Sequence, residues 1–344
     1  MHYIKELSFG ELGAWLKKHG EQSYRARQIF YWLYQKTVSD FDDMTDIGIS
    51  LRSKLKDGFR VSSLQLMRKL VSAIDNTQKY LLELTDKNTV ESVVMPYESR
   101  CTICISTQVG CRFHCVFCAS GKRGLIRDLS PAEIVEQVIV GKQQGNPITH
   151  IVFMGMGEPL DNTDNVIKAI LILNDPNAFN IGARRITIST CGIPEGIDKL
   201  MSLNLQIELS VSLHGATDEV RNRLMPINKK YPLPILIKKI KEYINKTNRQ
   251  VTFEYTLIDG INSSDKDALA LAKLIRGIDC KVNLIPFNTS TVMKTSGNPV
   301  SLTNVKKFQS VLERKNIKIT IRHSRGADIQ AACGQLSLNN TDLT

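Results

Sequence analysis

The hydrophobic pattern divides the chain into an N-terminal helical segment and a longer segment in which strands and helices alternate. Within residues 1–75, Leu12, Trp15 and Leu16 recur at helical spacing behind Ser8 and Glu11, which form a capping box. Two more helices are predicted from residue 23 onwards and over 49–59. We therefore expect residues 1–75 to form a separate helical domain.

From about residue 78 the apolar residues follow the period of strands, and helical stretches then separate one strand from the next. Strands are expected at 79–84, 90–96, 102–106, 148–154, 185–190, 206–213, 250–257, 281–285 and 317–322. Helices are expected at 131–144, 165–173, 195–203, 233–245, 265–277 and 302–315. This alternation predicts an α/β fold over 76–336, a parallel sheet of βα units that closes into a partial or full β/α barrel. Residues 337–344 are expected to be a disordered tail.

Composition restricts the compartment and the class of partner. No apolar run approaches the roughly 20 residues of a membrane span, so we expect no membrane association. Five of the eight cysteines lie between Cys101 and Cys118, unlike a secreted disulfide framework, which favours a reducing cytoplasm. The net charge of +11 favours polyanions, nucleic acid above all. Because the N-terminal helices are also basic, we expect that domain to contact RNA.

Three closely spaced cysteines, Cys111, Cys115 and Cys118, make one compact loop. Thiolates so close together remain deprotonated only beside a cation, and three ligands suit an iron–sulfur cluster with one open iron better than a closed four-ligand zinc site. Zinc, a disulfide pair and buried apolar thiols are the alternatives. The spacing itself is typical of radical S-adenosylmethionine (SAM) enzymes, in which SAM chelates the open iron of a [4Fe-4S] cluster.

Polar residues follow the predicted strands beyond the cysteine loop. Gly157 and Glu158 follow one strand, Ser189 ends the next, and Ser212 and His214 end the one after. The carboxyl ends of parallel strands are where α/β barrels bind their ligands, although such residues are often simple caps. Of the five cysteines outside the loop, two are candidates for a function: Cys104 on the strand before it, and Cys333 far along the chain. The polar, glycine-containing surroundings of Cys333 favour a functional thiol over a buried apolar one.

Together these motifs resemble the RlmN/Cfr family of radical SAM enzymes, which methylate an adenosine of 23S ribosomal RNA. The similar segments are VESV at 90–93, CISTQVGC at 104–111, GEPL at 157–160, MPINKKY at 225–231 and DIQAACGQL at 328–336. Pro159 and the LIPFN segment at 284–288 resemble RlmN, which acts at C2, more than Cfr, which acts at C8. Cys191 and Gln330 depart from the family pattern, and neither changes a role assigned here.

The resemblance implies a mechanism that consumes two SAM molecules per turnover. Cys333 would take a methyl group from one SAM, and a radical generated from the second would activate that group for addition to C2. Glu91 would act as the general base for the C2 proton, and Cys104 would attack the sulfur of Cys333 and release the product as a disulfide forms. The cluster would be held by Cys111, Cys115 and Cys118. The implied SAM contacts are Gly157, Glu158, Ser189, Ser212, Leu213, His214 and Asn288.

The resemblance also implies a flavodoxin or ferredoxin-type electron donor, and we expect a monomer. Contacts to RNA phosphates are assigned, besides the N-terminal helices, to Lys122, Arg123, Arg127, Arg184, Arg185, Lys229 and Lys230. The sequence leaves open methylation at C8, a second substrate in transfer RNA, a radical enzyme with a small-molecule or peptide substrate, and a zinc-dependent RNA-binding module without catalysis.

Overall fold

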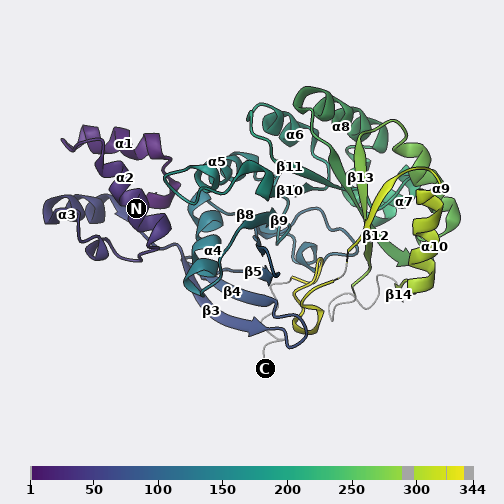
Figure 1. Cartoon of the computed structure of the whole chain (residues 1–344), viewed down its shortest axis with the longest axis horizontal. Helices are drawn as coiled ribbons and strands as arrows, with labels where there is room; N and C mark the ends of the chain where they lie inside the picture. The colour runs from purple at the N-terminus through teal and green to yellow at the C-terminus, as the bar shows by residue number, and fades with distance from the viewer. Residues whose placement is uncertain (1, 289–297, 323, 337–344) are drawn as a thin grey trace.

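The computed structural model describes residues 2–288, 298–322 and 324–336. The tail predicted at 337–344 lies outside these residues. The large unit and a smaller helical domain lie side by side along the long axis of the molecule (Figure 1).

The N-terminal helices form as their caps and apolar spacing predict. They are η1 (Ile4–Glu6), α1 (Phe9–Lys18), α2 (Arg25–Phe30), which continues as the π-helical turn η2 (Tyr31–Gln35), η3 (Phe41–Asp43) and α3 (Ile49–Gly58). The capping box of α1 is confirmed: the Ser8 hydroxyl accepts from the Glu11 amide at 3.2 Å, and the Glu11 carboxylate accepts from the Ser8 amide at 2.7 Å. A short parallel pair, β1 (His2–Tyr3) and β2 (Phe59–Arg60), ties the two ends of this domain together.

A buried ion pair joins the helical domain to the rest of the chain. Lys5 Nζ lies 3.0 Å from Oε1 of Glu136 on α4 (Pro131–Gln143), and the two side chains are 1% and 4% exposed. The second oxygen of Glu136 accepts from the Ser63 amide at 2.6 Å and also from the Ser63 hydroxyl. A separate contact runs from Lys142 Nζ to the carbonyl oxygen of Tyr34 at 2.9 Å. The helical domain is therefore fixed on α4.

Among the described residues, the large unit is built on one eleven-stranded sheet. Its parallel part follows the chain strand by strand: β6 (Cys101–Cys104), β9 (His150–Phe153), β10 (Ile186–Thr190), β11 (Glu208–Ser212), β12 (Val251–Asp259), β13 (Cys280–Pro286) and β15 (Lys318–Ile321). An antiparallel extension continues from β6 through β5 (Thr89–Pro96), β4 (Gln78–Leu84) and β3 (Leu64–Val71), and β14 (Asn298–Pro299) pairs with β12. The sequence analysis had placed residues 64–71 in the helical segment.

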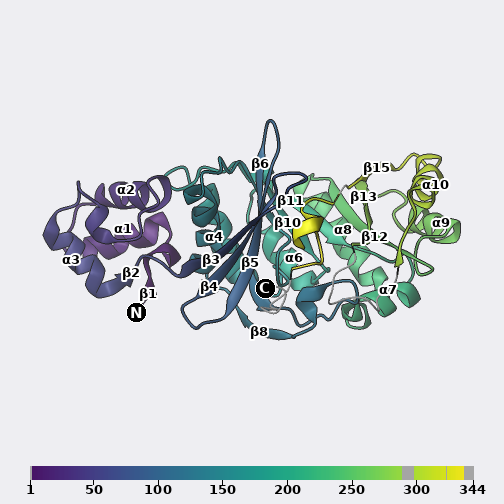
Figure 2. The same ribbon diagram turned by 90° about the horizontal axis from the view of Figure 1, so that it is seen from below.

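Between the described residues, the two ends of this sheet do not pair, so the predicted barrel is a partial one. The connecting helices are α4, α5 (Thr163–Asn174), α6 (Pro194–Met201), α7 (Asp218–Leu224), α8 (Leu233–Thr247), α9 (Asp265–Leu274) and α10 (Leu302–Glu313). They cover the outer face of the curved sheet (Figures 1 and 2). Each predicted strand and each predicted helix of this unit is present, with bounds shifted by a few residues. The short α7 and the hairpin of β7 (Gln108–Gly110) and β8 (Leu125–Asp128) were not predicted.

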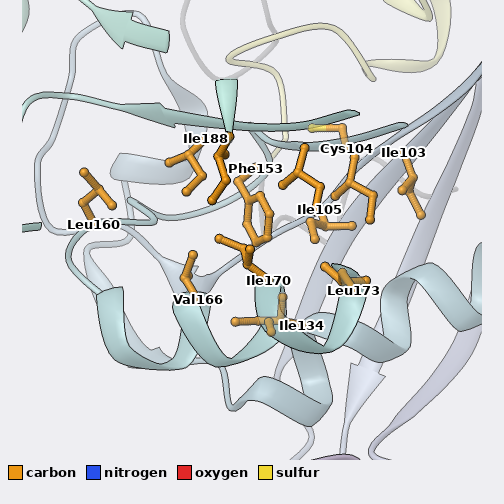
Figure 3. Packing of buried hydrophobic residues seen from close by; sticks show 14 of the residues in the cluster. Ile103, Cys104, Ile105, Ile134, Phe153, Leu160, Val166, Ile170, Leu173 and Ile188 are labelled. Atoms are coloured by element: carbon orange, nitrogen blue, oxygen red, sulfur yellow. The ribbon is translucent and has the colours of Figure 1, made fainter. Parts of the chain in front are cut away.

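Side chains alternate between the two faces of each strand, and this alternation positions the site. On β6 and just after it, Ile103 and Ile105 point toward the helices and pack near Ile134 and Leu173, whereas the sulfur of Cys104 points the opposite way (Figure 3). The inner face of the sheet, away from the helices, can therefore carry polar and reactive side chains. None of the described helices is both long and apolar enough to cross a membrane.

Candidate active site

The three-cysteine loop connects β7 to β8 and forms one wall of a pocket at the carboxyl ends of the parallel strands. Cys111, Cys115 and Cys118 all line this pocket. The returning segment packs tightly on the loop: the Cys111 amide donates to the carbonyl oxygen of Gly124 at 3.1 Å, and a Cβ on Gly110 would lie 2.0 Å from that oxygen. Gly110, at φ +78°, is therefore required by the close approach of two backbone segments.

The donor set fits an iron–sulfur cluster. Burial raises the pKa of Cys111 to about 12, and it raises the pKa values of Cys115 and Cys118 as well, so three ionised thiols need a compensating cation. No three His, Cys, Asp or Glu side chains of the described residues are close enough together to hold one metal ion. A cluster places each thiolate on its own iron, which separates the sulfur atoms more widely than a single zinc ion does.

Gly157 and Glu158 lie directly after β9 and line the same pocket. Gly157 has φ +96°, and a Cβ there would lie 2.5 Å from Cβ of Gln108, so only glycine fits. The buried carboxylate of Glu158 accepts from the amides of Leu160 at 3.0 Å and Cys191 at 2.7 Å. These bonds fix the carboxylate at the pocket wall, next to the cysteine loop.

The strand-end residues predicted to bind SAM meet at this pocket, with one exception. Ser189, Ser212, His214 and Asn288 line it, whereas Leu213 is fully buried in the core and does not. Burial, and secondarily the charge of Arg221, lower the pKa of His214 to about 3, so its ring is neutral.

The tautomer of His214 follows from its hydrogen bond. Its Nδ1 accepts from the Thr256 amide at 2.9 Å, which places the proton of the neutral ring on Nε2. The residue has φ +52°, and the Nδ2 group of Asn262 donates to its carbonyl oxygen at 2.8 Å. A buried neutral imidazole at the pocket wall supplies one hydrogen-bond donor for a polar ligand.

Cys104 and Cys333 line a second, larger cavity inside the partial barrel, and Cys333 also lines the pocket of the cysteine loop. Cys104 is buried on the inner face of β6, and Cys333 is exposed. All eight cysteines, every one of them among the described residues, are unpaired. The structure thus brings together two thiols that are far apart in the sequence.

The segment that carries Cys333 is docked on the cysteine loop by backbone contacts. The Ala119 amide donates to the carbonyl oxygen of Gly334 at 2.8 Å, and the Ser120 hydroxyl donates to that of Leu336 at 2.8 Å. Gly334 has φ +82°, and a Cβ there would lie 2.7 Å from the carbonyl oxygen of Phe117. The glycine after Cys333 therefore allows the two segments to meet.

Glu91 lies on β5, and its buried side chain is ion-paired with Lys79 at 3.0 Å. Glu91 lines neither of the two cavities described above. Lys79 also donates to the carbonyl oxygen of Gln330 at 3.2 Å, which links Glu91 to the Cys333 segment.

Sequence reasoning missed Glu254 and Arg322, which line both cavities, and the buried Arg221. Arg221 donates to the carbonyl oxygens of Cys191 at 2.6 Å and Leu213 at 3.2 Å, so it fixes two strand ends of the pocket. The sequence signals were a charged residue within an apolar strand at Glu254 and, for Arg322, its place among the polar residues that precede Cys333.

The basic side chains assigned to RNA differ in their surroundings. Arg127 is paired with Asp86 at 2.6 Å and Glu133 at 2.8 Å. The side chains that are exposed are Lys122, Arg123, Arg184, Arg185, Lys229 and Lys230.

Comparison with known proteins agrees with this geometry. The model of the Radical SAM superfamily matches residues 105–272, and that of the ribosomal RNA large subunit methyltransferase N-terminal domain matches residues 4–61. A crystal structure of a radical SAM methyltransferase from Sphaerobacter thermophilus superposes with a TM-score of 0.94 at 40% identity, covering 98% of this chain and 100% of that one.

Curated relatives cover nearly the full length. The probable dual-specificity RNA methyltransferase RlmN of Thermoanaerobacter sp. (strain X514) is 46% identical over 98% of both chains. That of Staphylococcus aureus (strain JH9) is 46% identical over 97% of this chain and 92% of its own. The cofactors of the superfamily are a [4Fe-4S] cluster and SAM, which the pocket fits. The chain is therefore a member of the RlmN family of radical SAM RNA methyltransferases.

Proposed function

We propose that the protein methylates C2 of an adenosine in 23S ribosomal RNA, and of an adenosine in transfer RNA, with Cys333 as the carrier of the methyl group and two SAM molecules per turnover. The dual-specificity RNA methyltransferases that it resembles support the choice of RNA. The observation that carries the mechanism is the meeting of Cys104 and Cys333 in one cavity that adjoins the pocket of the cysteine loop.

In this proposal the inner face of the partial barrel lines two neighbouring spaces with different roles: the pocket of the cysteine loop, and the cavity that contains Cys104 and Cys333. Cys111, Cys115 and Cys118 hold the cluster, which, with SAM, supplies the methyl group and the radical chemistry. Gly157, Glu158, Ser189, Ser212, His214 and Asn288 orient SAM; Leu213 contributes through its backbone, since its side chain is in the core.

The two remaining thiols act in sequence. The Cys333 sulfur attacks the methyl carbon of the first SAM, forming a C–S bond while the sulfonium C–S bond breaks. After the carbon has been joined to C2, Cys104 would attack the Cys333 sulfur, so that the S–S bond forms as the bond to the product carbon breaks. The electron pair of the broken bond stays on that carbon, which takes up a proton to become the methyl group, and an external thiol reductant then reduces the disulfide. Glu91 takes the C2 proton as the general base. Because Glu91 lies outside both cavities, this step requires the Cys333 segment to bring the adenine within reach of the Glu91 carboxylate.

The proposal includes partners and a compartment. The exposed basic side chains and the basic N-terminal domain bind RNA phosphates, and an adenosine flipped out of its stack enters the cavity. A flavodoxin or ferredoxin-type protein delivers the electron to the cluster, and the protein acts as a monomer in the cytoplasm, where its thiols stay reduced.

The test is mass spectrometry of digested ribosomal and transfer RNA, from cells with and without the gene and from reactions with the anaerobically reconstituted protein. We expect 2-methyladenosine only where the protein is present and Cys333 is intact. The Cys333→Ala variant, with unchanged iron and sulfide content, is the matched control. With the parent protein, 8-methyladenosine or unmodified RNA would disprove the proposal, as would a colourless protein that contains zinc. A normal yield of 2-methyladenosine from Cys333→Ala would also disprove it.

A further inference from the structure

The cationic side chain of Arg322 lies where the pocket of the cysteine loop adjoins the cavity that contains Cys104 and Cys333. Arg322 follows β15, its amide donates to the carbonyl oxygen of Leu284 at 2.9 Å, and its side chain is 32% exposed. It lines both the pocket of the cysteine loop and the cavity that contains Cys104 and Cys333. The roles proposed above leave this arginine without a function.

A buried carboxylate holds Arg322 in place. Nη1 of Arg322 lies 3.8 Å from Oε1 of Glu254, whose side chain is 4% exposed. The amide group of Asn283 donates to the same oxygen at 3.0 Å, and Oε2 of Glu254 has no hydrogen-bond partner among the described residues. The pair is too long for a tight salt bridge, so the guanidinium group keeps donors available for a second anion.

Met154 connects Arg322 to Cys104. Nη1 of Arg322 donates to the thioether sulfur of Met154 at 3.4 Å, and the backbone amide of Met154 lowers the pKa of Cys104. Arg322 also interacts electrostatically with Cys333, and this interaction is the largest contribution to its own raised pKa, ahead of those with Glu254 and Cys104. One guanidinium group thus lies at the wall of the cavity that both thiols line.

The two thiols compete for this charge. Burial raises the pKa of Cys104 to about 12; a negative charge on Cys333 raises it as well, and Arg322 and the Met154 amide oppose both effects. Glu254 and Tyr97 also interact with Arg322, Cys118 of the cysteine loop interacts with Cys333, and Arg325 lines the same cavity. Lys281 interacts with Glu254, and the Lys79–Glu91 pair lies beyond Cys104 on β4 and β5.

We propose that Arg322 is a shared counter-ion that stabilises the thiolate of Cys333 before methylation and, once the sulfur of Cys333 has been alkylated, the thiolate of Cys104. This positioning role deepens the proposed function and rests on it for the alkylated state of Cys333. Alkylation converts the Cys333 thiolate into a neutral thioether, which removes the competing anion. Cys104 then loses its proton to the buffer and becomes the attacking group only when there is a product to release.

The test follows the ionisation of Cys104 in the cluster-containing protein under anaerobic conditions. The rate at which iodoacetamide modifies Cys104 is measured by peptide mass spectrometry across a pH series, since only the thiolate reacts. Because iodoacetamide would also alkylate the exposed Cys333 of the parent, Cys333→Asp supplies an anion there that the reagent does not remove, and Cys333→Ala replaces it by a neutral side chain. We expect the Cys104 profile of Cys333→Ala to lie about one pH unit below that of Cys333→Asp, a roughly tenfold larger thiolate fraction at a given pH.

Adding Arg322→Gln to Cys333→Ala is expected to return the profile to higher pH, and Arg322→Lys to restore part of the difference. Lys281→Gln in the same background is the control, because it removes another cation of the cavity that interacts with Glu254 and not with the thiols. Equal profiles for the arginine, lysine and glutamine forms of this position, or an equal shift with Lys281→Gln, would overturn the proposal. Because neither SAM nor RNA takes part, the result is independent of whether 2-methyladenosine is formed.

Discussion

The buried ion pair between the two units gives the most direct test of how the helical domain is attached. Replacing Lys5 by Met removes the cation 3.0 Å from Glu136 and keeps most of the apolar volume of the side chain. Glu136 is 4% exposed, so its charge would remain in the interior with only the donors of Ser63. Breaking a buried pair from one side typically costs about 3–5 kcal/mol.

The same pair can be removed from both sides. In Lys5→Met/Glu136→Leu no unpaired charge remains, although the Ser63 amide loses its acceptor. We therefore expect the double variant to recover a large part of the loss, leaving a deficit of about 1–3 kcal/mol for the unsatisfied amide. Lys56→Met is the control: its partner Asp42 is 66% exposed, and a solvent-exposed pair contributes little to stability.

The assay is urea unfolding of the three variants and the parent at pH 7, followed by the fluorescence of Trp15 and Trp32, both in the helical domain. Limited proteolysis reports whether that domain detaches first. A loss below about 1 kcal/mol in Lys5→Met, or an equal loss in Lys56→Met, would refute the claim that this pair fixes the domain.

Three further predictions concern the site. Cys333→Ser should retain the iron and sulfide of the parent and lose methyl transfer at least about a thousandfold, measured by RNA mass spectrometry, because a hydroxyl is a far weaker nucleophile at neutral pH than a thiol. The pKa of His214 is lowered to about 3, so between this value and the unfolded value of roughly 6.5 only the unfolded chain takes up the proton. The free energy of unfolding should therefore fall on acidification by about 1.4 kcal/mol per pH unit. His214→Gln should abolish this part of the pH dependence, measured by urea titrations between pH 7 and 5. Gly334→Ala should cost about 1–3 kcal/mol in docking of the Cys333 segment, because φ is +82° and the new Cβ would meet the Phe117 carbonyl; hydrogen exchange at 326–336 would measure it, with protection equal to that of the parent as the contrary result.

Local signals in the sequence predicted most of the fold. The capping boxes at Ser8 and Ser130 and the apolar runs of the strands depend on residues a few positions apart, and those elements formed where expected. Strand β3 was missed because its alternate residues are exposed and its sequence carries charges at Arg68 and Lys69, so it lacks the apolar run of a buried strand.

The candidate site was predicted less evenly. The cysteine loop and the strand-end residues are carried by short motifs, and they meet in one pocket as expected, except for the side chain of Leu213. Glu254 and Arg322 belong to no such motif, and their pairing depends on how β12 and β15 curve around the cavity. The Lys79 partner of Glu91 lies on a neighbouring strand, and a single sequence gives no indication of such a pairing.

The docking of Gly334 and Leu336 onto the cysteine loop has a consequence for biosynthesis. These residues are synthesised long after the loop that they cover: 216 positions separate Leu336 from its partner Ser120. A nascent chain can therefore contain the cysteine loop and still lack the segment that forms one wall of the pocket around its three cysteines. Iron and sulfide that were loaded before this segment had been synthesised would enter an open pocket, and the segment would close one side of it afterwards.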